Sequence, residues 1–208
     1  TRVQTCALPI FHAESTWTGG WREAVFKGPV NLTGITYEQT RWDSAAGTLT
    51  AHRRAVPATN GSSSQHTLTD LQVTSGALRH GNSSAEFDLK LALRDGKFLP
   101  ESRFEASGKV RQFETEELQK LIGTNISLAG NVDGNFSASG TRHEPRGKGS
   151  VSIADGKLYG EDFTKLDADV QFDPGPVIRL SPVKLAHGGV ISGTATIRPA
   201  SREFDADL

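Results

Sequence analysis

Residues 86–94 read EFDLKLALR and residues 165–173 read KLDADVQFD, and these two stretches decide the fold. In each stretch every second residue is apolar, while most of the residues between are charged. A period of two is typical of a β-strand that buries one face and exposes the other to solvent. The alternating apolar residues are Phe87, Leu89, Leu91, Leu93, Leu166, Ala168, Val170 and Phe172.

The same alternation recurs along the rest of the chain, over residues 104–110, 126–136, 151–158 and 203–208. Dipeptides typical of tight turns punctuate it, because glycine takes the positive φ that hairpins need. These dipeptides are Asp95-Gly96, Asp133-Gly134, Asp155-Gly156 and Gly188-Gly189. We therefore predict an all-β protein, an elongated, twisted or curled antiparallel sheet shaped as a β-groove or taco.

One short helix is predicted near 115–122, TEELQKLI. Thr115 suits the N-cap, two acids follow in the first turn, and Gly123 suits the position after the last turn. By contrast, residues 53–67, RRAVPATNGSSSQHT, are polar and contain proline and three consecutive serines. That composition predicts a flexible loop.

Length and composition exclude several classes of protein. The chain has 208 residues, 36% of them hydrophobic, and a net charge of −1. This balance gives no electrostatic case for binding nucleic acid, and no apolar run is long enough to span a membrane. The one cysteine, Cys6, permits no disulfide within the chain and no site built from several thiolates.

An internal repeat is the most informative long-range feature. Residues 30–50 align with residues 151–171 at an offset of 121, which pairs Trp42 with Phe163. Beyond the serine-rich loop the alignment resumes at an offset of 107, with His80-Gly81 over His187-Gly188. We expect two β-repeat units, one over 11–122 that includes the loop and the helix, and one over 123–208 that is truncated at its C-terminus.

Residues 1–10, TRVQTCALPI, resemble the translation of a sequencing adapter, and we expect them to be non-native. At the other end, EFDADL alternates like the middle of a strand. We therefore expect the chain to be part of a longer protein.

No residue pattern predicts catalysis, so we expect no enzyme, no cofactor and no metal. The six histidines are isolated, and we interpret the turn histidines His80 and His187 as polar surface. No G-x-S-x-G motif is present. Acid pairs such as Asp167 with Asp169 could flank a sugar, but we interpret them as part of a solvated sheet face.

Three motifs follow one another within residues 123–208. A Gly-Thr precedes Pro145, residues 156–163 read GKLYGEDF, and residues 166–172 read LDADVQF. This order resembles the repeats of the TamB and AsmA-like family, the translocation and assembly module proteins of bacteria with two membranes. Within 30–122, the segments YEQTRWDSAAGTLT, HGNSSAEFDLKLAL and ETEELQKLIG also look like this family.

The resemblance implies a segment of a periplasmic protein that is anchored in the inner membrane through an N-terminal helix outside this chain. Such proteins are implicated in phospholipid transport between the inner and outer membranes and in outer-membrane protein assembly and secretion. The implied partners are phospholipid acyl chains and, through regions outside this chain, an outer-membrane assembly protein.

Inward apolar side chains would line the lipid groove, and we predict this role for Leu89, Leu91, Val132, Phe136, Ile153, Phe163, Val170 and Phe172. Two alternatives stay open. The same residues could form the closed core of a β-sandwich or adhesin-like binding module, or the chain could be a carbohydrate-active β-domain.

Overall fold

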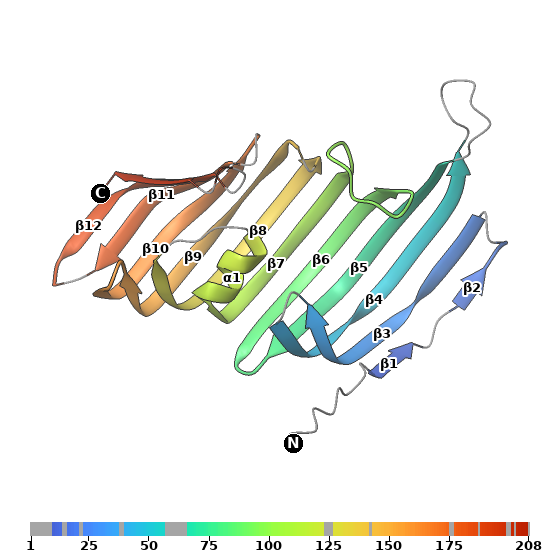
Figure 1. The fold of residues 1–208 in the computed structure, drawn as a ribbon, viewed down its shortest axis with the longest axis horizontal. Helices are drawn as coiled ribbons and strands as arrows, with labels where there is room; N and C mark the ends of the chain where they lie inside the picture. The colour runs from blue at the N-terminus through green and yellow to red at the C-terminus, as the bar shows by residue number, and fades with distance from the viewer. Residues whose placement is uncertain are drawn as a thin grey trace, which may run out of the picture.

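A computed structural model gives the fold. It describes residues 10–13, 16–20, 23–37, 40–56, 66–122, 127–141, 143–174, 177–186, 188–198, 201 and 203–207. All the strands in these ranges belong to one antiparallel sheet of thirteen strands, ordered along the chain from β1 to β13 with β2 beside β3 (Figure 1). β1 and β13 are not neighbours, so the sheet stays open. The predicted all-β antiparallel sheet is confirmed.

The longest strand is β4, and the strands shorten from β9 to β13. Their bounds are β1 Ile10–Ala13, β2 Thr16–Thr18, β3 Glu23–Tyr37, β4 Thr40–Val56, β5 His66–His80, β6 Ser83–Arg94, β7 Arg103–Glu114, β8 Leu128–Thr141, β9 Pro145–Leu158, β10 Glu161–Asp173, β11 Val177–Ala186, β12 Val190–Arg198 and β13 Glu203–Asp207.

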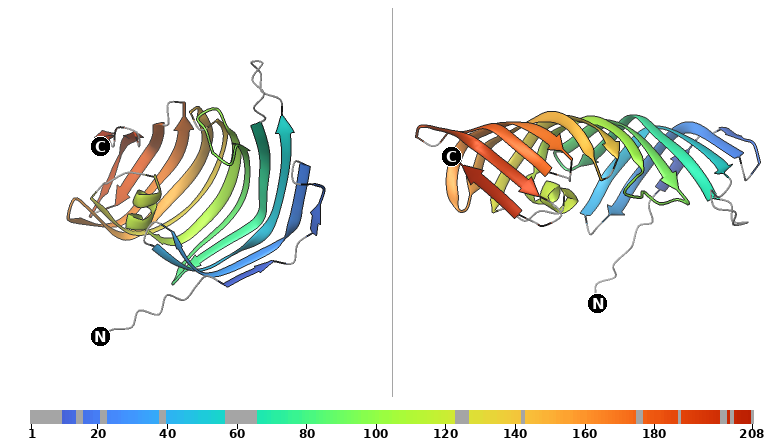
Figure 2. Two further views of the ribbon diagram at one scale, coloured as in Figure 1. Left: turned by 45° about the vertical axis from the view of Figure 1, so that its right-hand side comes forward. Right: turned by 90° about the horizontal axis from the view of Figure 1, so that it is seen from above.

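The sheet is elongated and curls across its strands, and α1 (Thr115–Ile122) lies on its concave side (Figure 2). A right-handed twist accumulates from strand to strand and gives a many-stranded sheet this shape. No second sheet covers the first within the described residues. The β-sandwich architecture is therefore not the one that these strands adopt.

The predicted helix is confirmed, since α1 spans the predicted residues 115–122 and carries Glu116 and Glu117 in its first turn. The prediction for 53–67 was partly wrong, because β4 continues to Val56 and β5 already begins at His66. Residues 57–65 lie outside the described residues, as do residues 1–9 of the adapter-like segment.

Two of the four predicted turn dipeptides lie inside strands. Asp95-Gly96 forms a turn, but Asp133-Gly134 lies within β8 and Asp155-Gly156 within β9. Asp155 has a φ of 49°, and it has no partner on β10 although both of its neighbours are paired. The glycine-containing pair therefore marks an irregularity in the strand, which is the other use of a strand glycine.

The aligned repeat segments occupy equivalent places in the sheet. Leu32 pairs with Ala45 in the β3–β4 hairpin, and 121 residues later Ile153 pairs with Leu166 in the β9–β10 hairpin. Gly34, like its counterpart Asp155, has a positive φ and no partner. The two units share one sheet, because β7 and β8 pair across the boundary at 122–123.

Candidate functional site: the apolar face of the sheet

An unbroken row of apolar residues crosses the concave face at right angles to the strands. Paired residues of antiparallel strands point to the same face, so the row follows directly from the register. We name it the central row, and it consists of Gly28, Leu49, Val73, Leu89, Ala106, Ala138, Gly147, Phe172, Ile178, Ile197 and Phe204. At about 4.8 Å per strand it extends about 50 Å without an ionisable group.

Four further rows run parallel to the central row on the same face. The glycine row, on the α1 side, is Gly76, Phe87, Gly108, Phe136, Gly149, Val170, Leu180, Ala195 and Ala206. The buried row, nearest to α1, is Phe113, Val132, Ile153, Leu166 and Leu185. The intermediate row, between the glycine row and the buried row, is Leu78, Ala85, Val110, Gly134, Val151, Ala168 and Val183. The outer row, on the far side, is Phe26, Ala51, Leu71, Leu91, Phe104, Gly140 and Pro145.

The eight predicted lining residues all belong to this face, but they divide into two groups. Val132, Ile153 and Phe163 are 5%, 2% and 3% exposed and are part of the core. The other five are half-buried and are Leu89, Leu91, Phe136, Val170 and Phe172. Only this second group presents surface that a ligand could touch.

Aromatic rings of the glycine row lie against neighbouring glycines. A Cβ atom at Gly76 would come within 2.7 Å of the Phe87 ring, and one at Gly108 would come within 3.1 Å of the Phe136 ring. The rings thus occupy the space that side chains would fill at those positions, an arrangement that compensates for glycine in a strand. The glycine row on β5–β8 therefore consists of aromatic rings packed over glycine backbone.

At one end of the strands the face is sealed by α1. Thr115 Oγ1 and Gln119 Nε2 both donate hydrogen bonds to the Leu128 carbonyl, at 2.8 and 3.1 Å, and fix the helix to the start of β8. The Trp42 and Phe113 ring centroids are 5.8 Å apart beside it. This end forms the hydrophobic core of the molecule.

At the other end of the strands the connection between β6 and β7 lies against the face. The Phe98 ring meets Phe104 of the outer row edge-to-face, with centroids 6.3 Å apart. The connection is held by the Leu99 N–H, which donates to Ser102 Oγ at 3.0 Å, and by the His143 N–H, which donates to the Pro100 carbonyl at 3.0 Å. Near β6 and β7, the central and glycine rows therefore lie between α1 and this connection.

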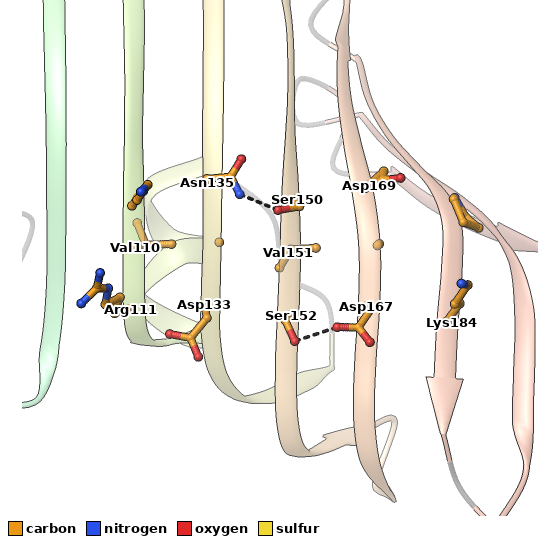
Figure 3. A pocket seen from close by; sticks show the side chains of 14 residues that line it. Val110, Arg111, Asp133, Asn135, Ser150, Val151, Ser152, Asp167, Asp169 and Lys184 are labelled. Atoms are coloured by element: carbon orange, nitrogen blue, oxygen red, sulfur yellow. Dashed lines mark hydrogen bonds between the residues drawn. The ribbon is translucent and has the colours of Figure 1, made fainter.

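The opposite face of the sheet is polar. Asn135 donates to Ser150 at 2.6 Å and Ser152 donates to Asp167 at 2.8 Å, around an open hollow of about 490 Å³ (Figure 3). Lys90 bonds Glu105 at 2.6 Å further along the same face. Every second residue contributes to this face, so the alternation read from the sequence separates two surfaces of opposite chemistry.

Asp167 does not have the electrostatics of a glycosidase acid. Hydrogen bonds from Lys165 and then from Ser152 hold the pKa of its carboxyl below the ordinary value, whereas a general acid needs a raised pKa. The described residues also contain no candidate metal site, because no group of three or more histidine, cysteine, aspartate or glutamate side chains among them is placed to hold a metal ion.

His80 is not simply polar surface. Its Nε2 lies 3.3 Å from Glu117 Oε1 of α1, and its ring meets Trp42 with centroids 6.0 Å apart. His187, its counterpart in the repeat, lies outside the described residues.

Over the part of the chain that the structure describes, no helix has the length and apolar character needed to cross a bilayer.

Comparison with known proteins returns no similar protein: no family model, no curated sequence and no solved structure matches this chain. The case for function therefore depends on the geometry of the two faces.

Sequence reasoning missed most of the central row, since only Leu89 and Phe172 of its eleven residues were predicted to line the groove. Leu49, Val73 and Ile178 lie on it but were not predicted to line the groove. Their own strands alternate only weakly, and their membership follows from pairing with Leu89 and Phe172. A register prediction for each hairpin would have found them.

Proposed function

We propose that this chain is a segment of a TamB/AsmA-like protein whose concave face carries phospholipid acyl chains between the inner and outer membranes. The central row is the observation that carries the proposal. It is apolar from β3 to β13, all its members except Gly28 and Ile197 are only partly buried, and no second layer covers it within the described residues. A closed core would leave no such surface.

The energetics of lipid transfer favour such a surface. A phospholipid carries about 30 methylene groups, and exposing them to water would cost about 24 kcal/mol at about 0.8 kcal/mol each. A continuous apolar track removes most of that cost without any chemical step. The direction of the row matters, because a track at right angles to the strands lengthens by about 4.8 Å with every strand added.

In this proposal the chain lies in the periplasm and is anchored in the inner membrane by a helix that precedes it. An outer-membrane assembly protein is met through regions beyond it, and the whole protein contributes to outer-membrane protein assembly and secretion. The segment described here supplies the track alone.

Photo-crosslinking tests the proposal with a matched pair of positions. Val170 lies in the glycine row and is half-buried, while its chain neighbour Asp169 is exposed on the polar face. A photoreactive residue at 170 should capture phospholipid from mixed vesicles, and the same residue at 169 should not. Equal capture at both positions, or capture at neither, would contradict the proposal.

A further inference from the structure

One arginine lies in line with the apolar rows of the concave face. On β4, Arg53 follows Leu49 of the central row and Ala51 of the outer row at a spacing of two residues, and the pairing of β4 with β3 and β5 is regular over this stretch. Side chains alternate between the faces of a strand, so Arg53 lies on the concave face. Among the strand residues that the structure describes, it is the only lysine or arginine that the register places there.

The residues beside Arg53 form the last row of the face at this end of the strands. Arg53 pairs with Ala24 of β3 and with Thr69 of β5, and Thr69 pairs with Leu93 of β6. We name these four residues the rim row. Two residues of strand at about 3.4 Å each separate it from the outer row by about 7 Å. Arg53 and Thr69 are half-buried, so the apolar surface of β4 and β5 is bordered by a guanidinium and a hydroxyl group.

A guanidinium at the border of an apolar surface suits an amphiphile that carries a phosphate. Its N–H donors form a planar fork that binds two phosphate oxygens at once, and a threonine hydroxyl can donate to a third. The outer and central rows meet the opposite requirement, because acyl chains gain from leaving water. Both requirements are satisfied within a few residues of the same two strands.

We propose that Arg53 and Thr69 bind the phosphate group of a phospholipid whose acyl chains lie on the outer and central rows. This inference rests on the proposed function and adds to it a fixed phosphate-binding position on β4 and β5. Such a position distinguishes phospholipids from lipids that have the same chains and no phosphate.

Two lipids with identical acyl chains test the phosphate site. The Kd of the full 208-residue chain is measured for fluorescent phosphatidylglycerol and for the matching diacylglycerol in the same detergent micelles. Arg53→Gln should weaken phosphatidylglycerol binding about tenfold, as expected for the loss of hydrogen bonds to a charged group, and should leave diacylglycerol binding unchanged. Arg53→Lys keeps the charge without the fork and should give an intermediate Kd for phosphatidylglycerol.

Arg54→Gln is the matched control. Arg54 is exposed on the polar face, where its Nη2 lies 3.3 Å from Asp70 Oδ2, so this variant should bind both lipids as the wild type does. Inorganic phosphate at the concentration of the lipid should not displace phosphatidylglycerol, and displacement would indicate a site for free phosphate and overturn the proposal.

The two lipids also separate this inference from the lipid track. If Arg53→Gln weakens binding of both lipids equally, or of neither, the phosphate site is refuted and the track is not. If the wild-type chain binds neither lipid, the track is refuted and the phosphate site with it.

Discussion

The buried row and the central row lie on the same face of the same strands and differ in what covers them. Phe113, Val132 and Ile153 of the buried row are 2–5% exposed beside α1. Leu89 and Phe172 of the central row are half-buried and lie outside that core cluster. Similar side chains therefore have two roles. The buried row stabilises the sheet, while the central row leaves apolar surface that a ligand can contact.

Truncation of one phenylalanine in each row should separate the two roles most strongly. Phe113→Ala removes a ring from the sealed core and should lower the free energy of unfolding by about 3–5 kcal/mol. Phe172→Ala removes a half-exposed ring and should cost about 1–2 kcal/mol. Urea denaturation followed by circular dichroism measures both, and equal losses would erase the distinction between the rows.

Packing at the sealed end should also resist added volume. A Cβ atom at Gly156 would lie 2.3 Å from the Phe163 ring and 2.7 Å from the Ala129 carbonyl. Gly156→Ala should therefore destabilise the protein by about 1–3 kcal/mol. Gly189→Ala is the control, since nothing lies within 4 Å of its added Cβ. A thermal melt in which the two variants match would show that the sealed end is loosely packed.

A charge placed on the central row should interrupt lipid binding. Ala106 pairs with Leu89 on one side and Ala138 on the other, so Ala106→Glu would force a carboxylate to lose water beneath a bound chain. We expect about a tenfold weaker Kd for a fluorescent phospholipid, which corresponds to about 1.4 kcal/mol. Ser107→Glu, on the polar face, should bind normally, and an unchanged Kd for Ala106→Glu would place the lipid elsewhere.

The polar face should show only small, local effects. The hydrogen bonds from Lys165 and Ser152 lower the pKa of Asp167. The ionised Asp167 carboxylate therefore stabilises the folded protein at pH values above the pKa of aspartate in the unfolded chain, and this stabilisation is lost as the pH falls through the pKa of Asp167 in the folded protein. Ser152→Ala should raise the midpoint of Asp167 in a carbon-detected NMR titration. Ser150→Ala, whose hydroxyl bonds Asn135 instead, should leave that midpoint where it is, and a shift of equal size would refute the assignment.

Local sequence predicts much of this fold, because alternation and helix-capping are short-range signals. The alternation in 86–94 gives β6 with its apolar face, and the composition of 115–122 gives α1. Strict alternation would nevertheless place Phe163 and Leu166 on opposite faces, yet both lie in the core. The irregular pairing at Asp155 reverses the alternation there, and a pattern of period two contains no sign of it.

The continuity of the central row could not be predicted from the sequence, because it depends on the register of ten strand pairs. A shift of one residue in any hairpin would move an entire strand to the other face. The position of His80 shows the same limit, since its partner Glu117 is 37 residues away in the chain and the two meet only when α1 folds back over β7 and β8.

The most direct test is paramagnetic relaxation with a phospholipid that carries a spin label on its acyl chain. The methyl signals of Val73, Leu89 and Ile178 report on β5, β6 and β11 along the central row, and Ile153 reports on the sealed core. A lipid that moves along the track should broaden all three row signals more than that of Ile153. Broadening confined to one strand, or equal at Ile153 and the row, would contradict a continuous track.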